Sequence, residues 1–152
     1  MSCLNVPGSK LLMSGEFIFA DTNLFLRYLT NDVAEQAEAF ERMLHRAARG
    51  EISLITNNLV LAEIIWTLES YYQLSKEMIQ ENVLAILNTP GLEVDEGQLV
   101  LKAILWYVEK NVDFIDAYNA AWADSRGIET ICTFDRKHFS RVEGLIAIAP
   151  GE

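Results

Sequence analysis

The chain has 152 residues, of which 51% are hydrophobic and 22% charged, a balance typical of a single globular domain with a substantial core. Its formal net charge of −10 argues against broad electrostatic adhesion to nucleic acids or anionic membranes. A site that binds cations could still act on nucleic acid. No apolar run approaches the roughly 20 residues of a membrane-spanning helix. The two cysteines have no partner at metal-ligand spacing, so a reducing cytoplasmic location is expected.

The first fifteen residues lack the basic start and the apolar stretch of a secretory signal. Residues 1–15 are therefore predicted to be a flexible extension, and residues 16–150 a single domain. Strands are predicted at 16–20, 52–55, 92–94, 130–133 and 145–148, and helices at 22–29, 33–50, 57–72, 75–87, 97–110 and 114–126. Short apolar strands separated by helices indicate an α/β fold, a three-layer α/β/α sandwich with a central, mainly parallel sheet.

Two aspartates directly follow predicted strands. Asp21 ends the segment FIFAD, and Asp135 follows TICTF. Because ligands of parallel α/β sheets gather beyond the carboxyl ends of the strands, both carboxylates are expected at one edge of the sheet. Each also suits a turn or a helix cap. Thr22 or Asn23 is predicted to cap the helix that follows the first strand.

Three further acids interrupt apolar surroundings. Glu63 lies in NLVLAEIIWTL, where a buried carboxylate is costly unless it is paired or bound to a cation. A salt bridge or a position at the rim of the helix would also explain it. Asp113 and Asp116, in NVDFIDAYNAAWA, can share one helical face. We interpret Asp116 as a ligand and Asp113 as either a helix cap or an acid that supports the site from outside.

Four segments, FADTNLFLRYL, NNLVLAEIIW, FIDAYNAAWADSRG and TICTFDRKHF, occur in an order and at separations that resemble the PIN domain, in particular the VapC-type toxin ribonucleases. The resemblance covers Phe17 to Pro150. The leader before the first strand is longer than in the usual family pattern, so Met13 is an alternative start. The resemblance implies that the acidic quartet is Asp21, Glu63, Asp116 and Asp135, with Asn23 and Thr133 as polar companions.

Four neighbouring carboxylates repel one another, and bound cations would relieve this repulsion. Mg²⁺ or Mn²⁺, as one or two ions, suits oxygen ligands, and such ions can activate water and stabilise a leaving oxygen. No side-chain nucleophile is required. His138 could approach a phosphate, but a surface role explains it as well. Four basic residues could hold RNA phosphates, although plain surface charge also explains each of them: Arg126, Arg136, Lys137 and Arg141.

The resemblance implies a metal-dependent endoribonuclease, the toxin of a type II toxin–antitoxin pair, which forms a homodimer and is restrained by a cognate antitoxin. The alternatives are a PIN nuclease of RNA processing and a PIN-like module that binds RNA or protein without cleavage. A phosphotransferase of the haloacid-dehalogenase type would have a second aspartate where this chain has Asn23. A receiver domain would need a lysine that TICTFD does not offer, so both of these classes are disfavoured.

Overall fold

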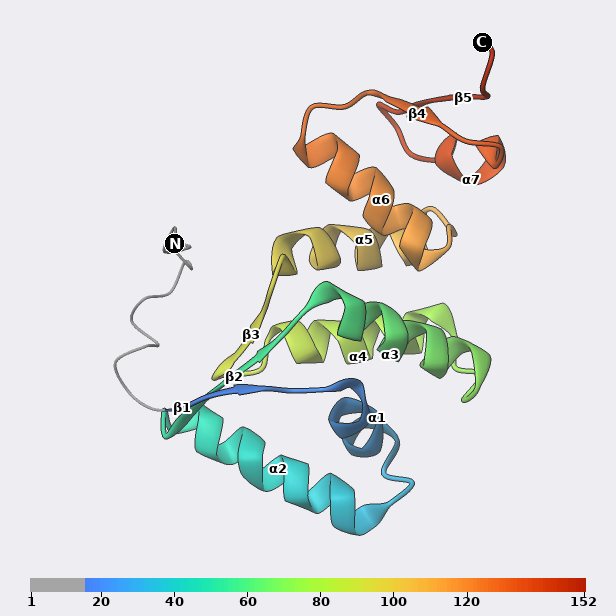
Figure 1. Cartoon of the computed structure of the whole chain (residues 1–152). Coiled ribbons are helices and arrows are strands. Elements are labelled where there is room, and N and C mark those ends of the chain that lie inside the picture. The colour runs from blue at the N-terminus through green and yellow to red at the C-terminus, as the bar shows by residue number, and fades with distance from the viewer. Residues whose placement is uncertain (1–15) are drawn as a thin grey trace.

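The structure, a computed structural model, describes residues 16–152, and the predicted N-terminal extension lies outside these residues. Among the described residues, none of the helices is long and apolar enough to span a membrane. In chain order the elements are β1 (Glu16–Phe19), α1 (Thr22–Thr30), α2 (Ala34–Ala48), β2 (Ile52–Thr56), α3 (Asn58–Ser70), α4 (Lys76–Leu87), β3 (Leu92–Val94), α5 (Gly97–Glu109), α6 (Phe114–Ser125), β4 (Thr130–Cys132), α7 (Arg136–Phe139) and β5 (Ile146–Ile148) (Figure 1).

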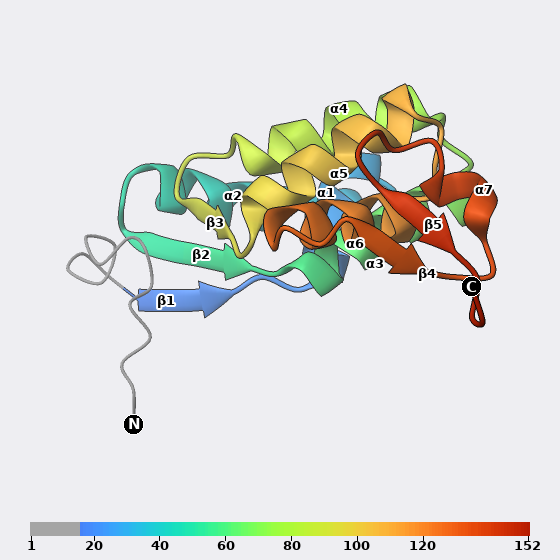
Figure 2. The same ribbon diagram turned by 90° about the horizontal axis from the view of Figure 1, so that it is seen from above.

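The strands form two parallel sheets. One has the order β1-β2-β3, and the other consists of β4 and β5. The predicted fold, an α/β sandwich with mainly parallel strands, is confirmed in its class and in the parallel sense of every strand pair that the structure describes. The sequence did not predict the division into two sheets. Helices α5 and α6 lie between them (Figure 1), and a view from above places β1 and β4 at opposite ends of the molecule (Figure 2).

Local side-chain bonds explain where several helices begin. The Asn57 side chain accepts a hydrogen bond from Val60 N at 3.1 Å, so Asn57 caps α3. The prediction that Thr22 or Asn23 caps α1 is wrong. Asp21 is the N-cap residue, and its carboxylate accepts a bond from Thr22 N at 2.8 Å. The first acid of the predicted site therefore also fixes the turn between β1 and α1.

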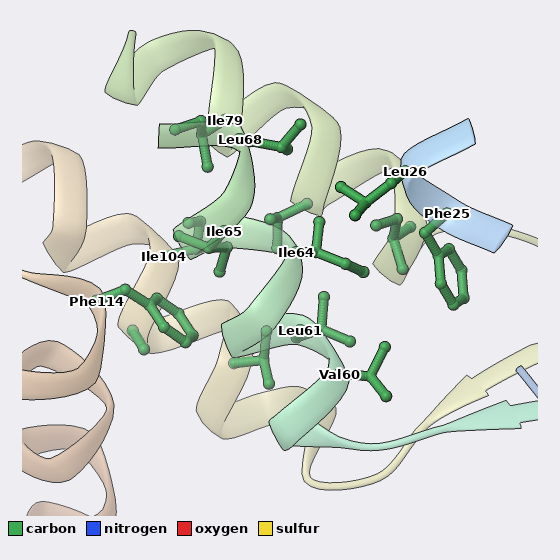
Figure 3. Packing of buried hydrophobic residues seen from close by; sticks show 14 of the residues in the cluster. Phe25, Leu26, Val60, Leu61, Ile64, Ile65, Leu68, Ile79, Ile104 and Phe114 are labelled. Atoms are coloured by element: carbon green, nitrogen blue, oxygen red, sulfur yellow. The ribbon is translucent and has the colours of Figure 1, made fainter. Parts of the chain in front are cut away.

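Helix α3 lies at the centre of the main core. Its residues Leu61, Ile64 and Leu68 are fully buried, and their spacing of three and four places them on one face (Figure 3). Complete burial of one such side chain contributes about 1.5–3 kcal/mol to stability. The sheet β1-β2-β3 and its helices thus have a large apolar core of their own.

The C-terminal sheet has a separate and much smaller core. It consists of Ala120 from α6, Phe139 from α7 and Val142, with Trp106 of α5 packed against them. Helix α7 was not predicted, because a helix of four residues has too few positions to show a periodic pattern. The small cluster anchors β4, α7 and β5 to α5 and α6 rather than to the sheet that contains β1.

Candidate active site

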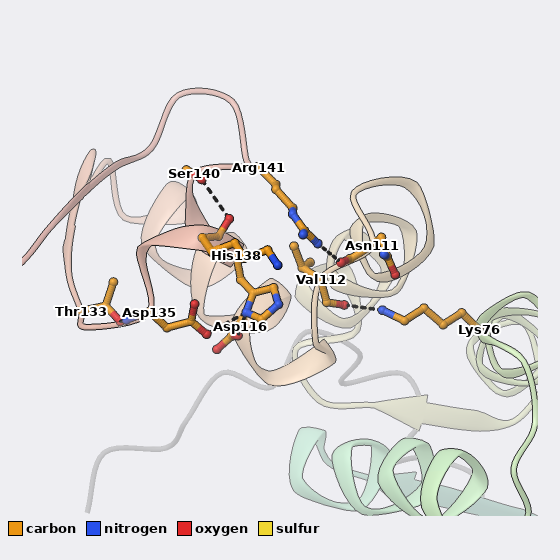
Figure 4. A network of polar contacts seen from close by, with 10 residues as sticks. Lys76, Asn111, Val112, Asp116, Thr133, Asp135, His138, Ser140 and Arg141 are labelled. Carbon is orange, nitrogen blue, oxygen red and sulfur yellow. Dashed lines mark hydrogen bonds and ion pairs between the residues drawn. The ribbon is translucent and has the colours of Figure 1, made fainter.

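The carboxylates of Asp116 and Asp135 converge with the imidazole of His138 (Figure 4). One ligand atom from each residue lies within 4.8 Å of the others. His138 Nδ1 lies 2.7 Å from Asp135 Oδ2 and 3.8 Å from Asp116 Oδ2. Two carboxylates and one imidazole form a donor set that suits Mn²⁺, and the carboxylates alone suit Mg²⁺. These residues are thus chemically able to hold the divalent cation that the sequence predicts.

The backbone explains how this cluster forms. Asp116 lies in the first turn of α6, whereas Asp135 is the N-cap residue of α7 and His138 lies within that short helix. The spacing of three between Asp135 and His138 makes them neighbours only because α7 is helical. The sequence interpretation of His138 as a surface residue therefore missed a member of the cluster. The one signal for it was the pattern D-x-x-H directly after a strand.

The two carboxyl groups of the cluster have opposite pKa shifts. Burial raises the pKa of Asp116, and the charges of Asp113 and Asp135 raise it further, while His138 lowers it. The pKa of Asp135 is lowered chiefly by its hydrogen bond with His138. When no cation is bound, a negative charge on Asp116 is therefore less favourable than a negative charge on Asp135. A bound cation would relieve the repulsion between Asp116 and its two acidic neighbours.

Three residues were predicted to support the acids from outside. Thr133 Oγ1 accepts a hydrogen bond from Asp135 N at 3.0 Å, so Thr133 fixes the turn that carries that carboxylate. Asp113 is the N-cap residue of α6 but makes no side-chain cap bond. It lines a cavity of about 320 Å³ together with Trp66 of α3, and its charge acts on the neighbouring acid of α6. Asn23 is exposed in the first turn of α1.

Asp21 and Glu63 do not join the cluster. Asp21 lies at the end of β1, and Glu63 lies on an exposed face of α3 beside the exposed Leu59 and Trp66. Of the explanations left open for Glu63, a position at the rim of the helix fits its exposure, because its apolar neighbours in sequence divide between the buried and the exposed faces of α3. Within one chain the four acids stand in two groups, one beside each sheet. That all four bind one metal site stays a prediction.

The basic residues proposed from the sequence surround the C-terminal sheet. Arg136 forms a 2.8 Å ion pair with the last residue of the chain, and the Arg126 guanidinium lies 4.8 Å from the centre of an indole ring in α6. Arg141 donates a hydrogen bond to the carbonyl of Asn111. Lys137 is exposed, and its charge helps to lower the pKa of the aspartate at the start of α7. Of the four, Lys137 is therefore the best placed to meet a phosphate at the cluster.

Comparison with known proteins identifies the family of the chain. Residues 18–145 match the PIN domain family. A VapC ribonuclease from Aquifex aeolicus (strain VF5) is 26% identical over 117 residues, which make up 77% of this chain and 86% of that relative. The family match begins within β1 and ends just before β5, so it covers β2, β3, β4 and all four predicted acids. The resemblance seen in the sequence is thus confirmed, and the chain belongs to the PIN domain family.

Proposed function

We propose that this PIN domain is a metal-dependent endoribonuclease that hydrolyses RNA phosphodiester bonds with one or two Mg²⁺ or Mn²⁺ ions. The observation that carries the proposal is the convergence of Asp116, Asp135 and His138 at the end of β4. The match to a relative that is named a VapC ribonuclease supports RNA as the substrate. The remaining acids of the proposed metal site are Asp21 and Glu63.

The metal, when bound, supplies a water of lowered pKa and positive charge beside the scissile phosphate. Asp116 and Asp135 would hold it with their carboxylate oxygens. His138, hydrogen-bonded to Asp135 through Nδ1, orients that carboxylate. Lys137 adds positive charge for an RNA phosphate without making the whole surface basic.

The substitution Asp21→Asn tests the mechanism. We expect it to reduce Mg²⁺- or Mn²⁺-dependent RNA cleavage by about 10²-fold or more, as the loss of one electrostatic stabiliser does in other enzymes. The unfolding midpoint in urea shows whether the fold is kept. Asp124→Asn is a matched control, because Asp124 is an exposed aspartate of α6 that pairs with Lys102 outside the cluster. Cleavage that survives both a chelator and Asp21→Asn would refute the mechanism.

We further propose that the nuclease is the toxin of a type II toxin–antitoxin pair, acting in the cytoplasm and restrained by a cognate antitoxin. Induced expression in a bacterial host should arrest growth, and a small adjacent reading frame should reverse the arrest. An active ribonuclease that does not arrest growth would instead favour a role in RNA processing. Binding of RNA without any cleavage product would favour a PIN-like binding module.

A further inference from the structure

A small cavity lies between helices α1 and α2. Its volume is about 200 Å³, and its apolar wall consists of Leu24 of α1 with Ala39, Phe40 and Met43 of α2. Phe40 is 2% exposed and belongs to the main core, whereas Ala39 is exposed. The cavity therefore has a packed apolar floor and an open mouth. It is smaller than most cofactor sites, which measure about 300–1,000 Å³, and its size suits a single flat ring system.

Three polar side chains line the same cavity. Asn23 and Arg27 come from α1, and Gln36 comes from α2. The spacing of four between Asn23 and Arg27 places them on one face of α1. Amide and guanidinium groups are the side chains that most often hydrogen-bond to the edges of nucleobases, and apolar side chains suit the flat faces of the bases. The lining thus has both of the features that a base requires.

Arg27 is held in one position by its neighbours. Its Nη1 donates to Asp32 Oδ2 at 2.8 Å, and its Nε donates to Gln36 Oε1 at 3.2 Å. Tyr72 OH donates to the same Asp32 oxygen at 2.7 Å. These bonds use Nε and Nη1 of a guanidinium that has five N–H donors in all. A guanidinium fixed in this way loses little further freedom when it donates to a ligand.

Charge and donor pattern favour a base over a phosphate in this cavity. The hydrogen bond from Tyr72 is the main cause that lowers the pKa of Asp32, so Asp32 is charged at neutral pH and offsets the charge of Arg27. A phosphate would meet this carboxylate, whereas a neutral base would not be repelled. Because Gln36 accepts from Arg27 through its carbonyl oxygen, its amide nitrogen is the part that can bond to a ligand. Two donor side chains match a base edge with two acceptors, as guanine has at N7 and O6.

The cavity reaches close to one of the predicted metal ligands. Asn23 lies two residues after Asp21, in the first turn of α1, and this separation is about 3 Å along the helix axis. A nucleotide with its base in the cavity would therefore have its neighbouring phosphates near Asp21.

We propose that the cavity between α1 and α2 binds one base of the RNA substrate close to the cleaved bond, and that guanine is preferred there. This inference rests on the proposed function, because it assumes that RNA is cleaved at the predicted acids. Leu24 and Met43 contact the faces of the base, and Arg27 and Gln36 donate to its edge. The cavity thus sets the sequence preference, whereas the acids serve the hydrolysis itself.

Short RNAs with one abasic ribose each test whether a base is recognised. The abasic site is moved through the sequence, and the intact RNA is the reference. For the wild-type protein, removal of the base at one position near the cleaved bond should slow cleavage by about tenfold or more, as the loss of one bidentate contact does. Ala39→Phe fills the cavity from its exposed mouth, so the same abasic site should cause no further loss in this variant. Replacement of guanine by adenine at that position should likewise slow only the wild-type protein.

Two more variants keep this test decisive. Ala34→Phe is the matched control, because Ala34 is an exposed alanine of α2 that does not line the cavity. It should keep the wild-type dependence on the base. Gln36→Ala removes a donor without adding bulk, so it should reduce the preference for guanine over adenine even if Ala39→Phe fails to fold. Urea unfolding shows which variants keep the fold.

Binding measurements separate this inference from the proposed function. Asp116→Asn protein with a chelator present should bind the same RNAs without cleavage, and fluorescence anisotropy gives the Kd of each RNA. A loss of affinity at one abasic position that Ala39→Phe abolishes would support the cavity, even if the wild-type protein cleaves no RNA and the proposed function falls. An active enzyme for which Ala39→Phe and the wild-type protein respond equally to every abasic site would overturn the cavity and leave the nuclease standing. Cleavage and binding that depend on no single base would overturn it as well.

Discussion

Replacement of Lys76 by methionine should weaken the junction between α5 and α6. Lys76 Nζ donates to Val112 O at 3.0 Å and to Tyr107 O at 3.3 Å, and it lies 4.2 Å from the centre of the Tyr107 ring. Tyr107 and Val112 are 0% and 1% exposed. Lys76→Met keeps most of the apolar stem and removes the donor, so two carbonyls lose their partner.

The expected loss follows from these contacts. A hydrogen bond from a charged donor contributes about 1.5–3 kcal/mol. A cation–π contact adds about 0.5–1 kcal/mol. Burial lowers the pKa of Lys76, which shows that desolvation of the ammonium offsets part of this gain. We therefore expect the free energy of unfolding to fall by about 2 kcal/mol, or the Tm by about 4–8 °C.

Urea unfolding of the two proteins, with a matched control, measures this loss. Lys102→Met removes an ammonium that also lies over an aromatic ring, that of Trp106 at 4.7 Å, but pairs with the exposed Asp124. An exposed pair of this kind contributes at most about 1 kcal/mol. If Lys76→Met lowers the free energy of unfolding no more than Lys102→Met does, and the m-value is unchanged, then the junction between α5 and α6 does not depend on Lys76.

Two further comparisons use matched variants. A Cβ at Gly91, where φ is 79°, would lie 2.2 Å from the Ala47 oxygen, so Gly91→Ala should cost about 3 kcal/mol or more in urea unfolding. At Gly50, where φ is 77°, an added Cβ would meet no atom within 4 Å, so Gly50→Ala should cost only about 1 kcal/mol. If the two substitutions lowered the free energy of unfolding equally, the predicted clash at Gly91 would be contradicted. With chelator present, Asp116→Asn should increase stability at pH 7, because its raised pKa makes the charged form unfavourable in the folded state. This gain should vanish below the ordinary pKa of 3.8. Asp135→Asn should decrease stability at pH 7, because the pKa of Asp135 is lowered in the folded state. This loss of stability should shrink as the pH falls through the pKa of the folded state. If both substitutions changed the free energy of unfolding in the same direction at pH 7, this reasoning would be refuted.

Helix and strand positions were predictable where the determinants are local. Strand β3 has the predicted bounds, and Asn57 and Ser75 cap the helices that they were expected to begin. Strand pairing is not local. β1 and β4 are both short and apolar, and nothing in either segment shows whether the two strands meet or are kept apart by α5 and α6. The apolar pattern of the sequence therefore could not predict the division into two sheets.

The candidate site was predictable in part for the same reason. Asp135 follows a strand and Asp116 starts a helix, so their placement could be read from neighbouring residues. The exposure of Glu63 depends on what packs against each face of α3, which a run of apolar letters does not reveal. His138 was missed because its contact with Asp135 requires a helix of four residues.

The small core beneath the C-terminal sheet gives this protein two very different rates of local opening. Ala120, Phe139 and Val142 bury far less apolar surface than the core around α3, so amide hydrogens of β4 and β5 should exchange with solvent long before those of α3. Proteases that attack such openings would remove Asp135 and leave the rest folded. Such cleavage would separate Asp135 and His138 from Asp116, which would stay with α6 on the folded N-terminal fragment.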